Sequence, residues 1–368
     1  MLNLRVIQAD YGDCFVVEFG APTHPRYILI DGGPKDVFSL YSRKEMERIS
    51  DLGGRLDFVQ VSHVDKDHIL GVLDLFAEIE AQRAANQDDL IGIAGLWLNS
   101  FDRTIDHGGD ISTRLHSALA TSDMAAMPMG ALALSGVDQG HAVRLKALQL
   151  GIPINEGFPN NLIRVDDAPA PIALDNLAIT IVGPTQDNLD ALHDEWIAWL
   201  DDNETALATM DPRVLTNSDQ SIPNLSSVMM HVEADGKTIL FTGDGRSDHL
   251  MDGLEATRLL DSSGKIHVDV LKVAHHGSDR NQTKTFFKKV TANTYVISAN
   301  GHPDNPDLAT LIWIVESAKQ QNRRIKIIAT NRRSTFDKLV DEYAPTDYGY
   351  ELEIMPSHWW YRHIALAP

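Results

Sequence analysis

One short stretch of the chain, residues 58–71, constrains the fold more than any other. Its first part, 58–61, is an apolar run that predicts a buried strand. The run breaks at Ser62 into a polar turn, and apolar residues resume at helical spacing from Ile69. The turn between these elements carries two histidines and two aspartates: His63, Asp65, Asp67 and His68. We therefore expect four potential metal ligands at a point where a strand ends and a helix begins.

The residue types in this turn indicate a metal site. Imidazole and carboxylate groups both bind zinc, and a mixed set of them also suits manganese or iron. Two carboxylates and two imidazoles within the segment 63–68 are poor core residues, and a turn that merely faced water would not require both histidines. The spacing therefore predicts a metal centre at this turn.

The pattern His63-x-Asp65-x-Asp67-His68 resembles the signature of the metallo-β-lactamase fold, whose commonest form is His-x-His-x-Asp-His. Asp65 stands where that form has its second histidine. This variant is typical of a subgroup that includes the hydrolase domain of ComEC-type DNA-uptake proteins and bacterial phosphorylcholine esterases. The resemblance implies an α/β fold, a four-layer αβ/βα sandwich spanning residues 1–368. It also implies an inserted helical and loop region at about 100–222 and a C-terminal extension at about 304–368.

Two later stretches strengthen the resemblance. A hairpin expected at 228–241 ends at Thr242-Gly243-Asp244-Gly245, which looks like the segment that carries the family's bridging aspartate, Asp244. An apolar strand at 268–274 runs into His275-His276-Gly277-Ser278, which resembles a segment of the ComEC-like subgroup. Adjacent histidines on an extended backbone point in opposite directions. We therefore expect His276 to bind metal and, by similarity to the esterases, His275 to face the substrate; the reverse assignment stays open.

The resemblance implies two divalent metal ions, zinc or manganese, that share Asp244. The ligands of the first ion would be His63, Asp65 and Asp244, and those of the second Asp67, His68, Asp244 and His276. The common pattern has one more histidine ahead of the bridging aspartate, but here the nearest one, His231, lies inside an expected strand. We therefore expect a first site that is weaker and more open to water or phosphate oxygens. The extra charge of Asp65 would favour harder metals such as manganese.

Further residues are expected around the metals. Asp67 would hold the attacking water. The candidate donors to substrate oxygens are Asn224, Ser227, Lys272 and Ser278. His302, in a Gly-His-Pro turn after a strand, either contacts a phosphate, acts as a general acid or is a structural turn residue. Asp13 and Asp31 either orient a ligand histidine through its other ring nitrogen or are turn-forming residues beside glycine.

Charge bears on the substrate class. The chain has 368 residues and a formal net charge of −20, and an acidic field repels phosphate backbones. A metal centre with a local basic patch can override that average. Candidate cations for such a patch are Arg280, Lys284, Lys288, Lys289, Arg323, Arg324, Lys326, Arg332 and Arg333. The alternative is that these residues lie on solvated helix and loop faces.

The sequence also bears on location. No apolar run approaches the ~20 residues of a membrane span, and the N-terminus lacks the pattern of a secretory signal. The single cysteine, Cys14, excludes an intramolecular disulfide and fits a reducing compartment. We therefore expect a cytoplasmic protein without a membrane span.

Two further segments carry structural predictions. Residues 201–223 are acidic and polar and predict a long loop after a helix at 189–200. Residues 350–354 and 358–365 predict a terminal hairpin.

The function that these features imply is a metal-dependent hydrolase, a phosphodiesterase or nuclease that activates water at a dinuclear centre to cleave DNA or RNA. An alternative is an enzyme that hydrolyses a small substrate such as a phosphocholine ester, a cyclic nucleotide or a lactone, which the acidic net charge favours. A third possibility is a non-catalytic binding scaffold.

Overall fold

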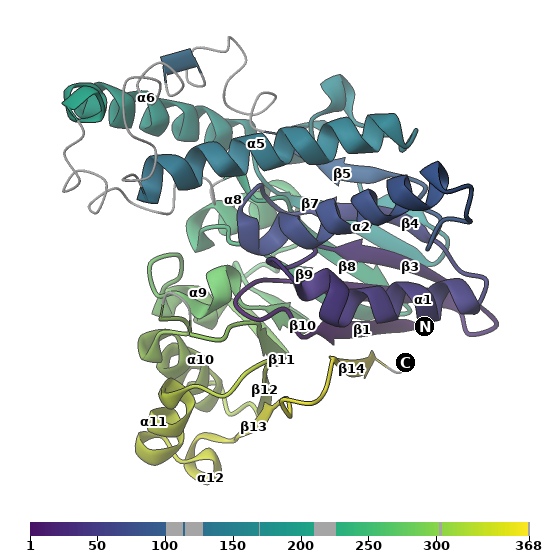
Figure 1. Cartoon of the computed structure of the whole chain (residues 1–368). Coiled ribbons are helices and arrows are strands. Elements are labelled where there is room, and N and C mark those ends of the chain that lie inside the picture. The colour runs from purple at the N-terminus through teal and green to yellow at the C-terminus, as the bar shows by residue number, and fades with distance from the viewer. Residues whose placement is uncertain (101–112, 115–127, 169, 210–225, 302–303, 367–368) are drawn as a thin grey trace.

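The computed structural model describes residues 1–100, 113–114, 128–168, 170–209, 226–301 and 304–366 (Figure 1). Within these residues the strands form two mixed sheets, which we term sheet A and sheet B. Sheet A has six strands in the order β14-β1-β2-β3-β4-β5, and sheet B has eight in the order β13-β12-β11-β10-β9-β8-β7-β6.

Sheet A brings the two ends of the described chain together. Its strands are β1 (Leu2–Ile7), β2 (Phe15–Ala21), β3 (His24–Ile30), β4 (Leu56–Val61), β5 (Leu96–Leu98) and β14 (Tyr361–Leu366). β3, β4 and β5 pair in parallel, and the remaining pairs are antiparallel. The two termini lie close together because β14 pairs with β1 (Figure 1).

Sheet B consists of β6 (Ile172–Leu174), β7 (Leu177–Gly183), β8 (Met229–Ala234), β9 (Lys237–Phe241), β10 (Ile266–Lys272), β11 (Val290–Ile297), β12 (Ile325–Ala329) and β13 (Tyr350–Ile354). The strands β9 to β13 pair in parallel, and β6 to β9 pair antiparallel. β6 and β7 come from the region expected to be an insertion, so part of that region belongs to the sheet.

Most of the helices lie between successive strands of the chain. They are α1 (Arg43–Asp51), α2 (Lys66–Ala84), α5 (Pro128–Gln149), α6 (Gln186–Thr209), α8 (Ser247–Ala256), α9 (Lys284–Lys289), α10 (Leu308–Gln320), α11 (Ser334–Glu342) and α12 (Pro345–Tyr348). A π-helical turn (Phe38–Ser42) precedes α1. None of the helices in the described part of the chain combines the length and the apolar character that a membrane crossing requires.

Three buried clusters define the layers of the molecule. The first packs α1, α2 and α5 against the outer face of sheet A, through side chains such as Phe76 and Val59. The second joins the inner faces of both sheets, with Phe15 on one side and Phe241 on the other. The third packs α8 to α11 against the outer face of sheet B. The protein is therefore an α/β sandwich of helices, sheet, sheet and helices, and the α/β prediction is confirmed at this level.

Two local predictions are wrong. The segments predicted as a terminal hairpin are strands of different sheets, because β13 pairs in parallel with β12 while β14 pairs antiparallel with β1. The helix expected to end at residue 200 continues to Thr209 within α6, and 210–225 lie outside the described residues. Three of the four residues 204–207, Glu204, Ala206 and Leu207, are strong helix formers and favour this continuation.

The parallel strands of both sheets end at one edge of the sandwich. β4 is buried along most of its length because both faces of the sheet are covered, so it appears in the sequence as an apolar run rather than an alternating one. The polar residues that follow β4, β9 and β10 are therefore brought together at this edge.

Candidate metal centre

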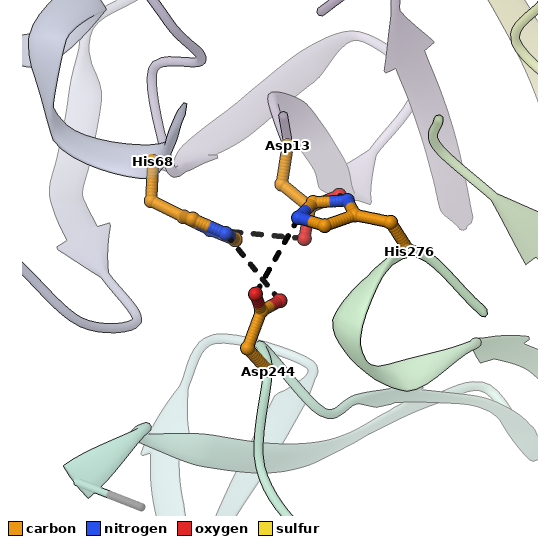
Figure 2. A group of neighbouring side chains, drawn as sticks. All are labelled: Asp13, His68, Asp244 and His276. Atoms are coloured by element: carbon orange, nitrogen blue, oxygen red, sulfur yellow. Dashed lines mark ion pairs between the residues drawn. The ribbon is translucent and has the colours of Figure 1, made fainter. Parts of the chain in front are cut away.

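Four buried side chains from distant parts of the chain converge at this edge (Figure 2). They are Asp13, His68, Asp244 and His276, and we call them the inner group. One potential ligand atom from each lies within 4.8 Å of those of the others. Asp13 precedes β2, His68 lies in the first turn of α2, Asp244 follows β9, and His276 follows β10.

The two imidazoles of the inner group point their Nε2 atoms at carboxylates. His68 Nε2 lies 3.4 Å from Asp244 Oδ1 and 3.8 Å from Asp67 Oδ2. His276 Nε2 lies 3.4 Å from Asp244 Oδ2 and 3.2 Å from Asp67 Oδ2. Both Nε2 atoms are buried without a hydrogen-bond partner. Lone pairs of nitrogen and oxygen directed at one point are the arrangement that a cation binds.

Hydrogen bonds at the other ring nitrogen fix these imidazoles. His276 Nδ1 donates to the backbone carbonyl of Ser298 at 2.8 Å, so Nε2 is the nitrogen that a metal ion would bind once its proton is displaced. His68 Nδ1 lies 2.9 Å from Asp31 Oδ2, a carboxylate that also accepts bonds from the backbone N–H and the hydroxyl of Ser62. Partners of this kind orient metal-binding histidines. Of the two roles left open for Asp31, the structure therefore favours the orienting one.

A second set of ligand types lies on the Oδ2 side of Asp244 and reaches the surface through two of its three members. We call His63, Asp65 and His275 the outer group. His63 Nε2 is 3.6 Å from Asp65 Oδ2 and 3.8 Å from Asp244 Oδ2, and His275 Nε2 is also 3.8 Å from Asp244 Oδ2. The side chains of Asp65 and His275 are 27% and 19% exposed, against 3% for Asp244.

The prediction about the paired histidines rested on an extended backbone, and that premise is wrong. His275 and His276 have φ angles of 47° and 53°, so both adopt the left-handed conformation in a short turn, Ala274–Gly277. The turn directs both rings toward Asp244 instead of to opposite sides.

Asp13 reaches the centre because of a glycine. A Cβ on Gly12 would lie 1.9 Å from the carbonyl oxygen of Asp67, so any larger residue would push the loop away. The N–H of Asp13 donates to that same carbonyl at 3.1 Å. The Asp13 carboxylate then lies 3.6 Å from His276 Nδ1 and 3.8 Å from His68 Nδ1. It also forms a very short ion pair with Lys272.

Lys272 is buried behind the centre. Its ammonium donates to the carbonyl of Gly243 at 2.7 Å, pairs with Asp13 and lies 3.4 Å from Asp244 Oδ1. Burial opposes its charge, but Asp13 and Asp244 outweigh burial and raise its pKa. Lys272, predicted as a substrate contact, thus balances carboxylate charge inside the protein in this arrangement.

The electrostatics of the inner group indicate a shortage of positive charge. Burial disfavours a charged ring, yet the carboxylates of Asp244 and Asp13 raise the pKa of His276 to about 10. The pKa of His68 is likewise raised well above its usual value, against burial, by Asp244 and Asp67. Burial would raise the pKa of Asp244, but His276 and His68 hold it well below the usual range. Without a metal ion, protons on the histidines therefore supply the missing cation.

The other predicted site residues have these positions. Ser227 is buried, and its hydroxyl accepts a hydrogen bond from the N–H of Asp244 at 3.2 Å. Ser278 is also buried, and its N–H donates to the carbonyl of His275. Asn224 and His302 lie outside the described residues.

Sequence reasoning missed three contributions to this site. Asp13 was expected to orient a ligand histidine or to form a turn, and its carboxylate does lie beside the Nδ1 atoms of His276 and His68; its place within the buried cluster itself was not expected. The Ser62 hydroxyl lies 3.1 Å from His63 Nδ1 and 3.2 Å from His68 Nδ1. Asn281 contacts both His275 and the backbone of Asp244. The adjacent Gly12 and the apolar residues after Asp13 are the signal that could have indicated a buried carboxylate.

Comparison with known proteins adds no assignment, since no family model matches the chain and a search of curated proteins finds no match. The donor chemistry of the site is the remaining guide. The imidazole Nε2 atoms of His63, His68 and His276 are buried and have no hydrogen-bond partner, and all three face the carboxylate of Asp244. This set of donor atoms fits a divalent metal ion.

Proposed function

We propose that the protein is a metal-dependent hydrolase of the metallo-β-lactamase fold that acts on phosphodiesters. One observation carries the proposal: the unpartnered Nε2 atoms of His63, His68 and His276 surround the buried carboxylate of Asp244. Buried nitrogens without a hydrogen-bond partner are costly, and a metal ion would satisfy them in place of the protons that the metal-free histidines take up. The α/β sandwich, and the resemblance of the residue 63–68 motif to the family signature, support the same assignment.

The two oxygens of Asp244 favour a dinuclear centre. Oδ1 faces His68, whereas Oδ2 faces His63, His275 and His276. The ligands that we propose are His63, Asp65 and Asp244 for one ion, and Asp67, His68, Asp244 and His276 for the other. Two divalent ions there would polarise a phosphoryl oxygen and lower the pKa of a water between them.

The chain's own residues have defined tasks in this scheme. Asp67 is 22% exposed and lies at the rim of the inner group, so its carboxylate can hold and orient the attacking water. Burial would raise its pKa, but His68 and His276 lower it, so Asp67 remains ionised and accepts a hydrogen bond instead of giving a proton. Asp31 holds the imidazole of His68 in position, and the carbonyl of Ser298 holds that of His276.

A nuclease is the leading form of this hydrolase, but charge pairing favours a second candidate, an enzyme for small substrates. Several cations proposed for a basic patch are neutralised: Lys284 pairs with Glu316, Lys326 with Glu353, and Arg332 with Asp337, each at 2.5 Å. Affinity for nucleic acid depends on cations available to phosphates. A small phosphodiester would need only the metal centre and its rim.

A metal-dependent cleavage assay tests the proposal. Chelator-treated protein is reloaded with Mn²⁺ or Zn²⁺ and given bis-p-nitrophenyl phosphate, single-stranded DNA and double-stranded DNA. We expect hydrolysis of the small ester to depend on metal and to vanish in Asp244→Asn. Cleavage of DNA would identify a nuclease, and hydrolysis confined to the small ester would favour the second candidate. A metal-loaded protein that cleaves none of them would refute the hydrolase proposal and leave a scaffold.

A further inference from the structure

The outer group has a feature that the proposed ligand sets do not use. Those sets give the first ion only His63, Asp65 and Asp244 as protein ligands. The ring of His275 lies on the same side of Asp244, and its Nε2 is as far from Oδ2 as that of His63, 3.8 Å in each case. A second imidazole nitrogen is therefore in position beside an incomplete set of three ligands.

Asn281 determines which ring nitrogen of His275 donates a hydrogen bond. The amide nitrogen of Asn281 donates to the backbone carbonyl of Asp244 at 2.9 Å, so its amide oxygen must face the other way. That oxygen lies 2.7 Å from His275 Nδ1, which therefore carries the proton as donor. With Nδ1 as the donor, Nε2 is the ring nitrogen that faces the carboxylate of Asp244, at 3.8 Å from Oδ2. An imidazole nitrogen and a carboxylate oxygen at this separation are two ligand atoms that one cation could join.

The separations between ligand atoms in the outer group are slightly longer than those around a bound zinc ion. Tetrahedral zinc, with bonds of about 2.0–2.1 Å, sets neighbouring ligand atoms roughly 3.3–3.5 Å apart. The three separations in the outer group are 3.6, 3.8 and 3.8 Å, which correspond to bonds of about 2.2–2.3 Å. A small contraction around an ion would bring them into range.

The backbone places His275 there at a conformational cost. Its φ of 47° lies in the left-handed region, which is unfavourable for a residue with a side chain. The N–H of His275 donates to the carbonyl of Gly243, which ties this turn to the loop that carries Asp244. The strained turn is therefore built onto the bridging aspartate itself.

We propose that His275 is the fourth protein ligand of the first metal ion and replaces the histidine that this chain lacks ahead of Asp244. This inference rests on the proposed dinuclear centre and deepens it. The first site then has two imidazoles and two carboxylates, His63, His275, Asp65 and Asp244. Its position near the surface leaves it open to exchange, whereas His276 serves the buried ion.

Metal titration of chelator-treated protein tests the assignment without an activity measurement. Co²⁺ is added to the wild type and to four variants: His275→Asn, His275→Asp, His276→Asn and His193→Asn. Visible absorption and equilibrium dialysis report the coordination and the number of ions bound. Asn and Asp tolerate positive φ better than other side chains, so the turn should survive both changes at 275. The exposed His193 on α6 is the matched control.

We expect two equivalents of Co²⁺ in the wild type and in His193→Asn. His275→Asn should keep one tightly bound ion and bind the second at least about tenfold more weakly, since even outer-shell changes cost that much. The carboxylate of His275→Asp should restore the second equivalent with an altered spectrum. His276→Asn should lose the other ion instead. If His275→Asn fails to fold, by near-UV circular dichroism, His275→Gly replaces it because glycine adopts this φ freely.

Two results separate the inference from the function it rests on. Unchanged affinities and spectra for both ions in His275→Asn would overturn the ligand role while leaving the hydrolase proposal intact. A wild type that binds two ions, loses one in His275→Asn, and hydrolyses no ester would support the ligand role and defeat the proposed function. A wild type that binds no ion would defeat both.

Discussion

The inner and outer groups share Asp244 but differ in how they are built. The inner group is buried, and its imidazoles are oriented by a backbone carbonyl and by the carboxylate of Asp31, itself bonded to Ser62. The outer group reaches the surface, and its imidazoles are oriented by the side chains of Ser62 and Asn281. A backbone carbonyl, and a carboxylate held by two hydrogen bonds, leave an imidazole less freedom than the hydroxyl and amide side chains of Ser62 and Asn281.

This difference indicates a division of labour between the two groups. An ion in the buried site does not compete with bulk water for its ligands, and these ligands come from three distant segments, so it should bind tightly and stabilise the fold. An ion beside the exposed Asp65 and His275 can keep a position for water or a substrate oxygen. The comparison predicts that the two ions respond differently to substitutions.

The largest effect should come from the residue that both groups share. Asp244→Asn removes the charge that joins the two groups, so we expect both ions to be lost and hydrolysis to fall to background. The loss should exceed the roughly 10–100-fold that removal of an outer-shell partner costs. Metal analysis after dialysis and the rate on bis-p-nitrophenyl phosphate measure it. If Asp244→Asn kept one ion at full occupancy, the carboxylate would belong to one group only.

A smaller effect is expected at Asp31, which touches His68 directly at 2.9 Å but reaches His63 only through Ser62. Asp31→Asn weakens the orientation of the His68 ring, and we expect roughly 10–100-fold lower affinity for the inner ion. The outer ion should change less. Competition titration with a chelator of known affinity separates the two. An equal loss of affinity for both ions would show that Ser62 transmits the effect of the substitution to His63 in full.

The sequence could predict much of the inner group and little of what orients it. His68, Asp244 and His276 could be predicted as neighbours because the motifs that carry them resemble the ligand segments of one family, and the structure shows that each follows a buried strand. The conformation at His275 and His276 could not be predicted, because contacts with the loop at Gly243 set it. Local pattern carries no information about such contacts.

The pairing of strands that are distant in the sequence was the second feature that the sequence could not predict. The segments of β13 and β14 have the pattern of a hairpin, but two open sheet edges were available, and each strand joined a different one. Asp13 was equally hard to assign, because an aspartate beside glycine is usually a turn residue. Only the approach of the Gly12 loop to the backbone of Asp67 places its carboxylate in the centre.

The pH dependence of the inner group provides a finer test. In the metal-free protein the pKa of His276 is about 10, raised from an ordinary value near 6.5. A raised pKa stabilises the folded protein fully below about pH 6.5, and this stability is lost as pH rises through about 10. Metal binding must displace the same proton, so affinity should rise by up to about tenfold per pH unit for each proton released.

Thermal unfolding and calorimetric titration measure this dependence between pH 6 and 10. The melting temperature of the metal-free protein should fall as pH rises across this window, and that of the metal-loaded protein should fall much less. His276→Asn should flatten the metal-free profile. A profile that is flat in the metal-free wild type would mean that the carboxylates of Asp244 and Asp13 do not hold a proton on His276, and the inner group would then not be short of cationic charge.

The smallest effect should come from Asp65, which distinguishes this motif from the commoner one and lies wholly in the outer group. Asp65→His exchanges a hard carboxylate for an imidazole, so the outer ion should shift its preference from Mn²⁺ toward Zn²⁺ by a few-fold. The inner ion should be unaffected because Asp65 contacts His63 but none of the inner imidazoles at ion-pair distance among the described residues. Parallel titrations with both metals measure the shift. A change of metal preference confined to the inner ion would assign Asp65 to that ion instead. An unchanged preference at both ions would mean that Asp65 binds neither and that water takes its position beside the outer ion.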